Sequence, residues 1–166
     1  MAAARLRVSV ATPDFVQPSR KSTASARQAL EVRGLGPWVV KHAPAKAKGD
    51  LSIAIVSDRR MRALNRQFRG NDAVTDVLSF PADTSTSLRA SEPRFLGDIV
   101  IASGVATKQA KAAGHTLQTE VRVLALHGLL HLIGYDHESD DGMMARAERR
   151  LRKKAGLKEG LIERAK

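Results

Sequence analysis

The feature that most constrains this chain is the segment HGLLHLIGYDH, in which three histidines lie within eleven residues. His127 and His131 are four residues apart, so on a helix their side chains stand one turn above the other on the same face. Gly134 predicts the end of that helix, because glycine enters the left-handed backbone conformation without steric cost. The chain can then turn and bring His137 toward the other two imidazoles.

Three imidazoles directed at one centre predict a metal site, with one zinc ion per chain as the expected occupant. Three protein ligands leave a fourth position for water, which is typical of catalytic rather than structural zinc. Nickel, cobalt or copper would also suit this ligand set. The chain has no cysteine, so thiolate ligands and disulfide bonds are excluded. Purely structural histidines are the better interpretation for His42 or His115 alone, but not for the triple, because burying several titratable rings on an apolar helix is costly.

The spacing of the three histidines is shared with the metzincin proteases, whose motif is H-E-x-x-H-x-x-G-x-x-H. In those enzymes the residue after the first histidine is the glutamate that serves as general base. Here that residue is Gly128. A peptidase function therefore lacks its base, although a zinc hydrolase of another class stays open as an alternative.

Hydrophobic periodicity outside this segment predicts alternating strands and helices. Helix ends are indicated by candidate capping residues and by glycines and prolines. The expected strands lie near residues 6–10, 51–57, 74–80 and 95–102, and the expected helices cover residues 19–33, 58–68, 103–113, 117–133 and 140–154.

A length of 166 residues fits one domain over residues 1–166, and no apolar run is long enough to cross a membrane. We therefore expect a cytoplasmic protein without a membrane partner. The formal net charge of +11 favours a polyanionic partner such as nucleic acid. The basic run RAERRLRKK in the last expected helix, at about residues 140–154, either guides RNA or simply solvates that helix. Only 4% of the residues are aromatic, so the sequence gives little sign of a platform for stacking bases.

The histidine segment resembles the H-G-x-L-H-L-x-G-Y-D-H signature of the YbeY family of bacterial single-strand endoribonucleases, with no departure from it. Two further segments, LNRQFRGNDAVTDVLSFP at 64–81 and FLGDIVI at 95–101, agree with the same family. The resemblance covers about residues 51–145. It implies an α+β fold with a small mixed sheet of about four strands packed with five or six helices, and a metal site at the C-terminal end of a central helix.

The resemblance also implies a function and a set of partners. It implies zinc on His127, His131 and His137, cleavage of single-stranded RNA, maturation of the 16S rRNA 3′ end, and ribosome quality control. The expected partners are single-stranded RNA, rRNA, and ribosomal subunits or ribosomal proteins. A noncatalytic, zinc-stapled ribosome-assembly factor is the remaining alternative.

Four residues complete the predicted site. The arginine of the family segment LNxxFRG, held to be functionally essential, matches Arg69, whose guanidinium can hold a phosphate bidentately. We expect Arg69 and His127 to be catalytic. Asp136 is either a general base or, preferably, a support that orients a ligating imidazole. Asp98, a polar residue within an apolar strand, is a possible supporting residue.

Overall fold

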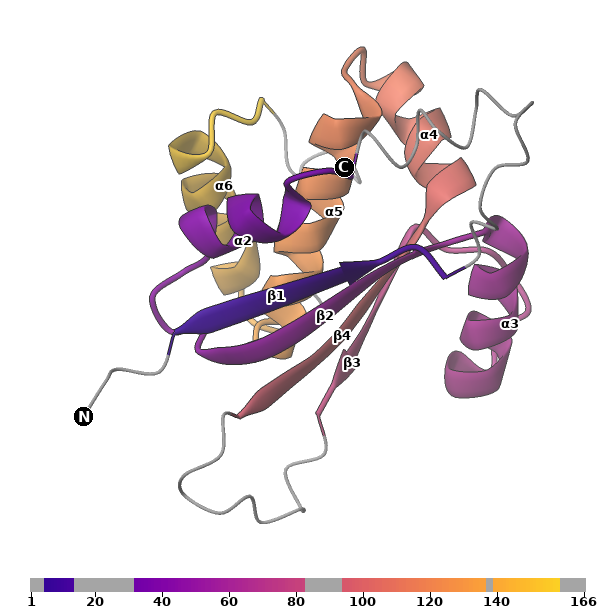
Figure 1. Ribbon diagram of the computed structural model, residues 1–166, viewed down its shortest axis with the longest axis horizontal. Helices are drawn as coiled ribbons and strands as arrows, with labels where there is room; N and C mark the ends of the chain where they lie inside the picture. The colour runs from indigo at the N-terminus through magenta and orange to yellow at the C-terminus, as the bar shows by residue number, and fades with distance from the viewer. Residues whose placement is uncertain (1–4, 14–31, 83–93, 137–138, 159–166) are drawn as a thin grey trace.

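A computed structural model of the chain describes residues 5–13, 32–82, 94–136 and 139–158 (Figure 1). These residues form an α+β structure with one mixed sheet of four strands and five helices. The fold class expected from the sequence is therefore confirmed. No helix in these ranges is long and apolar enough to cross a membrane.

The sheet has the strand order β1-β2-β4-β3. Its strands are β1 (Leu6–Ala11), β2 (Gly49–Val56), β3 (Val77–Pro81) and β4 (Phe95–Ala102). Strands β1, β2 and β4 run parallel, while the edge strand β3 pairs antiparallel with β4. Pro81, which has no backbone N–H to donate, ends β3 at the sheet edge, where a proline is tolerated.

The helices are α2 (Leu35–His42), α3 (Asp58–Arg69), α4 (Ser103–Ala112), α5 (Leu117–Leu132) and α6 (Met143–Lys154). In Figure 1, α2, α5 and α6 gather above the sheet, whereas α3 lies by itself at its right-hand end. Almost every residue of α5 beyond its first turn is buried, which makes it the central helix of the fold.

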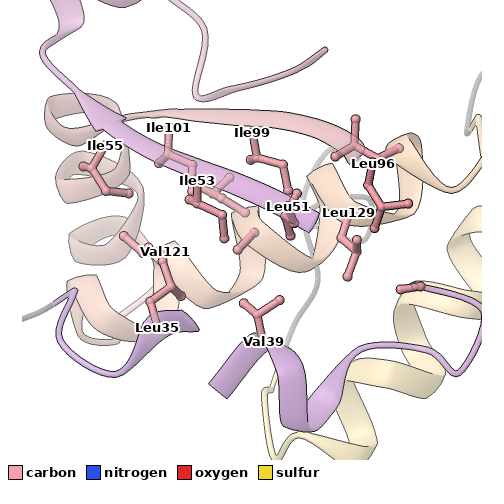
Figure 2. Packing of buried hydrophobic residues seen from close by; sticks show 14 of the residues in the cluster. Leu35, Val39, Leu51, Ile53, Ile55, Leu96, Ile99, Ile101, Val121 and Leu129 are labelled. Carbon is pink, nitrogen blue, oxygen red and sulfur yellow. The ribbon is translucent and has the colours of Figure 1, made fainter. Parts of the chain in front are cut away.

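The two faces of the sheet bury different clusters because side chains alternate along a strand. Ile53, Ile99 and Ile101 point to the face covered by α2 and α5, where they pack against residues such as Leu129 (Figure 2). The alternate residues of the same strands pack against Met61 of α3 on the other face. A third cluster joins the outer side of α5 to α6. Helix α5 is thus enclosed between the sheet and α6.

Helix α2 is not among the helices expected from the sequence, because it contains two residues that usually break helices, Gly36 and Pro37. Both lie in the first turn of α2, after the N-cap residue Gly34. Proline is tolerated there because its missing N–H would have no partner within the helix. A Cβ on Gly36 would lie 3.2 Å from the carbonyl oxygen of Val8, so glycine lets α2 approach β1 closely. The helix predicted over residues 19–33 falls almost wholly outside the described residues.

Helix α3 begins with a serine cap. The N-cap of α3 is Ser57, whose side chain accepts a hydrogen bond from the N–H of Arg60. Asp58, the first residue of α3, accepts hydrogen bonds from the N–H groups of Gly104 and Val105 at the start of α4, at 2.9 and 3.1 Å. The carboxylate therefore joins two helices that are distant in sequence, and it lies where the α4 dipole favours negative charge.

Candidate metal centre

His127 and His131 lie on one face near the C-terminal end of α5, as their spacing predicts. Their Nε2 atoms are 3.2 Å apart, and their ring centroids are 4.9 Å apart. His127 is buried, and His131 is partly buried. The two imidazoles therefore present the same nitrogen to a common point.

The separation of the two Nε2 atoms agrees with what zinc requires. Zinc binds imidazole nitrogen at about 2.0–2.1 Å, and tetrahedral angles then put two ligand nitrogens about 3.3–3.4 Å apart. The 3.2 Å between His127 and His131 is close to this value. The pair fits two adjacent positions of a tetrahedral site without movement of either helix turn.

Glu148 of α6 holds the ring of His127 from the other side. Its Oε1 lies 3.0 Å from Nδ1 of His127, and only about 6% and 5% of the histidine and glutamate side chains are exposed. A carboxylate can only accept a hydrogen bond, so Nδ1 carries the proton and Nε2 keeps its lone pair. Carboxylate–histidine pairs of this kind orient the ligands of metal sites.

Sequence reasoning missed Glu148. It is the one acidic residue in the basic helix α6, and it falls on the buried stripe of that helix with Met144 and Leu151. A carboxylate at a buried helix position needs a partner. This combination of position and charge was the available signal, although the sequence did not indicate which histidine would receive it.

The end of α5 has the geometry expected of a sharp turn. Gly134 has a φ of 91°, and its N–H donates to the carbonyl oxygen of His131. The N–H of Tyr135 donates to the carbonyl oxygen of Leu130. These two bonds form a Schellman motif, which reverses the chain after the last helical turn.

The third predicted ligand, His137, lies outside the described residues. Among the residues that are described, no group of three or more histidine, cysteine or carboxylate side chains could hold a metal. The described residues therefore bring together two imidazoles and one carboxylate, at the turn that ends α5.

Gly128 lies where α5 touches the sheet most closely. A Cβ at this position would be 2.9 Å from Cγ2 of Ile99 and 3.0 Å from Oγ of Ser79. The Ser79 hydroxyl also donates to the Gly128 carbonyl oxygen at 3.2 Å. A glutamate, as proteases have after their first histidine, would have to displace the side chains of Ile99 and Ser79. The contacts thus explain why glycine occupies this position.

The two aspartates of the predicted site have different surroundings. Asp136 is exposed, and its carboxylate accepts a hydrogen bond from the hydroxyl of Ser139. Asp98 pairs in register with Phe80, which packs with the cluster on the α3 face of the sheet. Asp98 therefore lies on the face of the sheet that α3 covers, opposite to the face covered by α5, and its supporting role stays a prediction.

Arg69 is the last residue of α3 and is exposed. It carries no hydrogen bond or ion pair to another described residue. Since α3 covers the opposite face of the sheet from α5, Arg69 belongs to a second surface and not to the cluster around His127.

The two histidines interpreted as structural from the sequence have ordinary partners. Nδ1 of His42 lies 2.8 Å from the carbonyl oxygen of Trp38, one turn earlier in α2. His115 lies just before α5, and its Nε2 is 2.5 Å from Oε2 of Glu120. Each of these rings is engaged locally, without a second imidazole beside it.

Comparison with known proteins identifies relatives over most of the chain. The family model described as Endoribonuclease YbeY matches residues 19–156. A protein of that name from Solibacter usitatus is 49% identical over 110 residues, which are 66% of this chain and 69% of that protein. Another from Campylobacter fetus is 41% identical over 125 residues, covering 75% and 88% of the two chains.

A solved structure has a similar fold. The solution structure of TM1509 from Thermotoga maritima superimposes with a TM-score of 0.51 and covers 89% of this chain and 88% of its own. The two sequences are 24% identical, so this likeness concerns the fold.

Proposed function

Because this chain belongs to the YbeY family of endoribonucleases, we propose that it is a metal-dependent endoribonuclease that cuts single-stranded RNA. The substrate that we infer is ribosomal RNA, with maturation of the 16S rRNA 3′ end and ribosome quality control as the cellular roles. Such roles belong to the cytoplasm, in contact with ribosomal subunits. The observation that carries the proposal is the facing pair of Nε2 atoms on His127 and His131, backed by Glu148.

In this proposal, His127, His131 and His137 hold one zinc ion. When bound, a divalent metal supplies Lewis acidity to a phosphate oxygen or to a water molecule. The protein prepares this site through Glu148, which keeps the proton of His127 on Nδ1 and leaves Nε2 as a ligand. Burial of both side chains excludes water that would compete for the Glu148 carboxylate.

The charge of the protein favours a phosphodiester substrate. The formal net charge of +11 attracts a polyanion from solution. Arg69 supplies an exposed guanidinium, whose planar donors can bind two oxygens of one phosphate. Since Arg69 lies on the α3 surface, we infer that it acts on RNA that extends beyond the metal site.

A peptidase function is disfavoured by the packing of Gly128. The glutamate that activates water in the protease motif does not fit at this position, because even its Cβ would lie 2.9 Å from Cγ2 of Ile99 and 3.0 Å from Oγ of Ser79. The carboxylate nearest to His127 among the described contacts, Glu148, is buried behind the ring and engaged with Nδ1. It is therefore poorly placed to serve as the missing base.

An RNA cleavage assay tests the proposal. Purified protein is incubated with single-stranded 16S rRNA 3′ fragments, with and without a chelator, beside His131→Ala, Arg69→Ala and the matched control His42→Ala. We expect cleavage by the wild type and by His42→Ala, and loss of cleavage with chelator and with His131→Ala. Intact RNA in every lane, with retained binding to ribosomal subunits, would instead support a noncatalytic assembly factor.

Cleavage that survives both chelator and His131→Ala would point to a contaminating nuclease. Release of peptide fragments from an unstructured protein substrate would favour the peptidase alternative. Each result thus selects one of the three functions considered for the histidine site.

A further inference from the structure

Helix α6 carries a residue of the proposed metal centre on its inner side. Glu148 lies among the buried residues with which α6 packs against α5, and its Oε1 is 3.0 Å from Nδ1 of His127. Figure 1 shows α6 beside α5, to its left. Burial of this side fixes both the position of α6 and its rotation about its own axis relative to the histidines.

The outer side of α6 is strongly basic. Four exposed cations recur there at intervals of three and four residues and so lie on one side of the helix, namely Arg146, Arg149, Arg150 and Lys153. With a rise of 1.5 Å per residue, the row is about 10 Å long. Glu148, the only acidic residue of the helix, faces the opposite way. We call these four residues the α6 basic face.

The charge of the α6 basic face is not compensated within the described part of the chain. There, no carboxylate forms an ion pair with Arg146, Arg150 or Lys153. Arg146 donates to a backbone carbonyl oxygen at 3.2 Å, which leaves its charge in place. The exposed Arg7 and Arg62 differ, because each donates two hydrogen bonds to an aspartate. The α6 basic face is therefore available to a negatively charged partner.

The arrangement of these cations is unfavourable for the helix itself. A helix face that only meets water gains stability from charges of opposite sign placed three or four residues apart. On the α6 basic face such pairs join two cations, for example Arg146 and Arg150, and like charges at this spacing destabilise a helix. Arg146 also lies in the first turn, where the helix dipole disfavours a cation and where α6 has no acidic residue. A bound polyanion would remove both costs.

We propose that the α6 basic face binds the phosphodiester backbone of single-stranded RNA next to the histidine pair. Guanidinium and ammonium groups bind phosphates whatever the bases are, so this face holds RNA without sequence preference. The face and Glu148 lie on opposite sides of one helix, whose diameter with side chains is about 10–12 Å. The α6 basic face therefore holds nucleotides that flank the one at the proposed metal centre.

A phosphate backbone fits this face better than a protein partner does. All four of its residues are charged, whereas the centre of a protein interface is depleted of charged residues. A protein would have to present several acidic groups at matched positions, but a nucleic acid strand carries a negative charge at every nucleotide. The choice of RNA rests on the proposed function. The inference adds which surface holds the RNA and by which residues.

Binding measured apart from cleavage tests this face. A fluorescein-labelled 12-nucleotide single-stranded RNA is titrated by anisotropy, in buffer containing EDTA, with a triple variant that combines Arg146→Gln, Arg150→Gln and Lys153→Gln. The matched control removes the same charge from exposed residues of β1 and α4 through Arg7→Gln, Lys108→Gln and Lys111→Gln. The melting temperature of each protein is measured alongside.

We expect the α6 triple variant to bind this RNA at least about 10-fold more weakly than the wild type at about 0.1 M salt. The slope of log K against log salt should fall by about 2, which corresponds to three phosphate contacts on a single strand. The control triple variant should keep the wild-type slope. The melting temperature of the α6 triple variant should equal or exceed that of the wild type, because the repulsion between like charges is relieved.

Wild-type RNA binding by the α6 triple variant would overturn the proposal, and a lower melting temperature beside it would mean that the cations only stabilise the helix in water. Equal losses in both triple variants would also overturn it, because net charge rather than this face would then attract RNA. Loss of binding to a ribosomal protein, with RNA binding unchanged, would assign the face to a protein partner instead.

These outcomes are distinct from those of the proposed function. RNA binding that depends on the α6 basic face, without cleavage by the wild type, would support the face and reject the nuclease. Cleavage by the wild type, with RNA binding that is indifferent to the α6 triple variant, would do the reverse.

Discussion

The two ends of α5 each carry a histidine paired with a glutamate, but the pairs differ in which ring nitrogen they use. At the N-terminal end, Nε2 of His115 binds Glu120, five residues away. At the C-terminal end, Nδ1 of His127 binds Glu148 of another helix, and Nε2 faces His131. The same two residue types therefore form a local structural pair at one end and, in our proposal, part of a metal site at the other.

The difference shows that a histidine is prepared for metal binding by which of its ring nitrogens the carboxylate engages, and not simply by having a carboxylate beside it. A glutamate on Nδ1 fixes the ring and leaves Nε2 directed outward, which is the arrangement of oriented metal ligands. A glutamate on Nε2 uses the outer nitrogen of His115 itself. A second imidazole completes the contrast, because of these two histidines only His127 has one beside it, that of His131.

The largest loss of stability should come from Gly128→Glu, which introduces the glutamate of the protease motif near the C-terminal end of α5. Its side chain would collide with Ile99 and Ser79, and a buried carboxylate would lack a partner. We expect a loss of about 4 kcal/mol or more in the free energy of unfolding, measured by urea denaturation. The milder Gly128→Ala should lose about 1–3 kcal/mol. A stable Gly128→Glu protein with peptidase activity would contradict the assignment of this end.

Removing His115 should affect folding and spare the metal site. His115→Ala leaves the carboxylate of Glu120, which is 0% exposed, without its imidazole partner. We expect a loss of about 2–3 kcal/mol in the free energy of unfolding, somewhat less than for a fully buried pair because the histidine is 18% exposed. Metal affinity should not change. Loss of metal binding in a folded His115→Ala protein would mean that the two ends are not independent.

Removing the charge of Glu148 should affect the metal and spare the fold. Glu148→Gln keeps the size of the side chain but weakens its hold on Nδ1 of His127. We expect metal affinity to fall about 10- to 100-fold, measured by competition with a fluorescent chelator. The matched change at the other end, Glu120→Gln, should leave affinity at the wild-type value. Equal effects of the two substitutions would remove the distinction between the pairs.

An exposed ion pair provides the smallest effect and a reference for both buried pairs. Arg7 of β1 donates two hydrogen bonds to Asp50 of β2 at 2.5 and 2.7 Å, and these bonds lower the pKa of the Asp50 carboxyl. The contribution of this ion pair to stability is therefore present above the pKa of about 3.9 that Asp50 has in the unfolded chain. It is lost as the pH falls through the lower pKa that Asp50 has in the folded protein. Urea denaturation of Asp50→Asn should show a small deficit at pH 7 that vanishes in acid. A deficit that persists there would have another cause.

Much of the fold could be predicted from local patterns. Strand β4 was expected over residues 95–102 and has those bounds, because its β-branched run has no competing helical period. Helix α5 was expected to end at Gly134, and it does so through the left-handed turn that glycine permits. Helix α2 could not be predicted from local patterns. Gly36 and Pro37 usually break helices, but here they form the first turn of a helix that lies against β1.

The site was predictable where it depends on spacing and not where it depends on tertiary contacts. The four-residue interval brings His127 and His131 together on α5, as expected. The contact with Glu148 joins residues 21 apart on two helices, which no local pattern specifies. The orientation of Asp98 depends on strand register, and its placement away from the histidines followed only from the pairing with Phe80.

Metal content tests the contrast between the two ends of α5 most directly. Wild type, His127→Ala and His115→Ala are purified, saturated with zinc and freed of excess metal. The ratio of zinc to protein is then measured by inductively coupled plasma mass spectrometry and protein quantification. We predict one zinc per chain for the wild type and for His115→Ala, and close to none for His127→Ala. Equal zinc in all three proteins, or loss of zinc in His115→Ala alone, would contradict the assignment of the metal site to His127 and its neighbours.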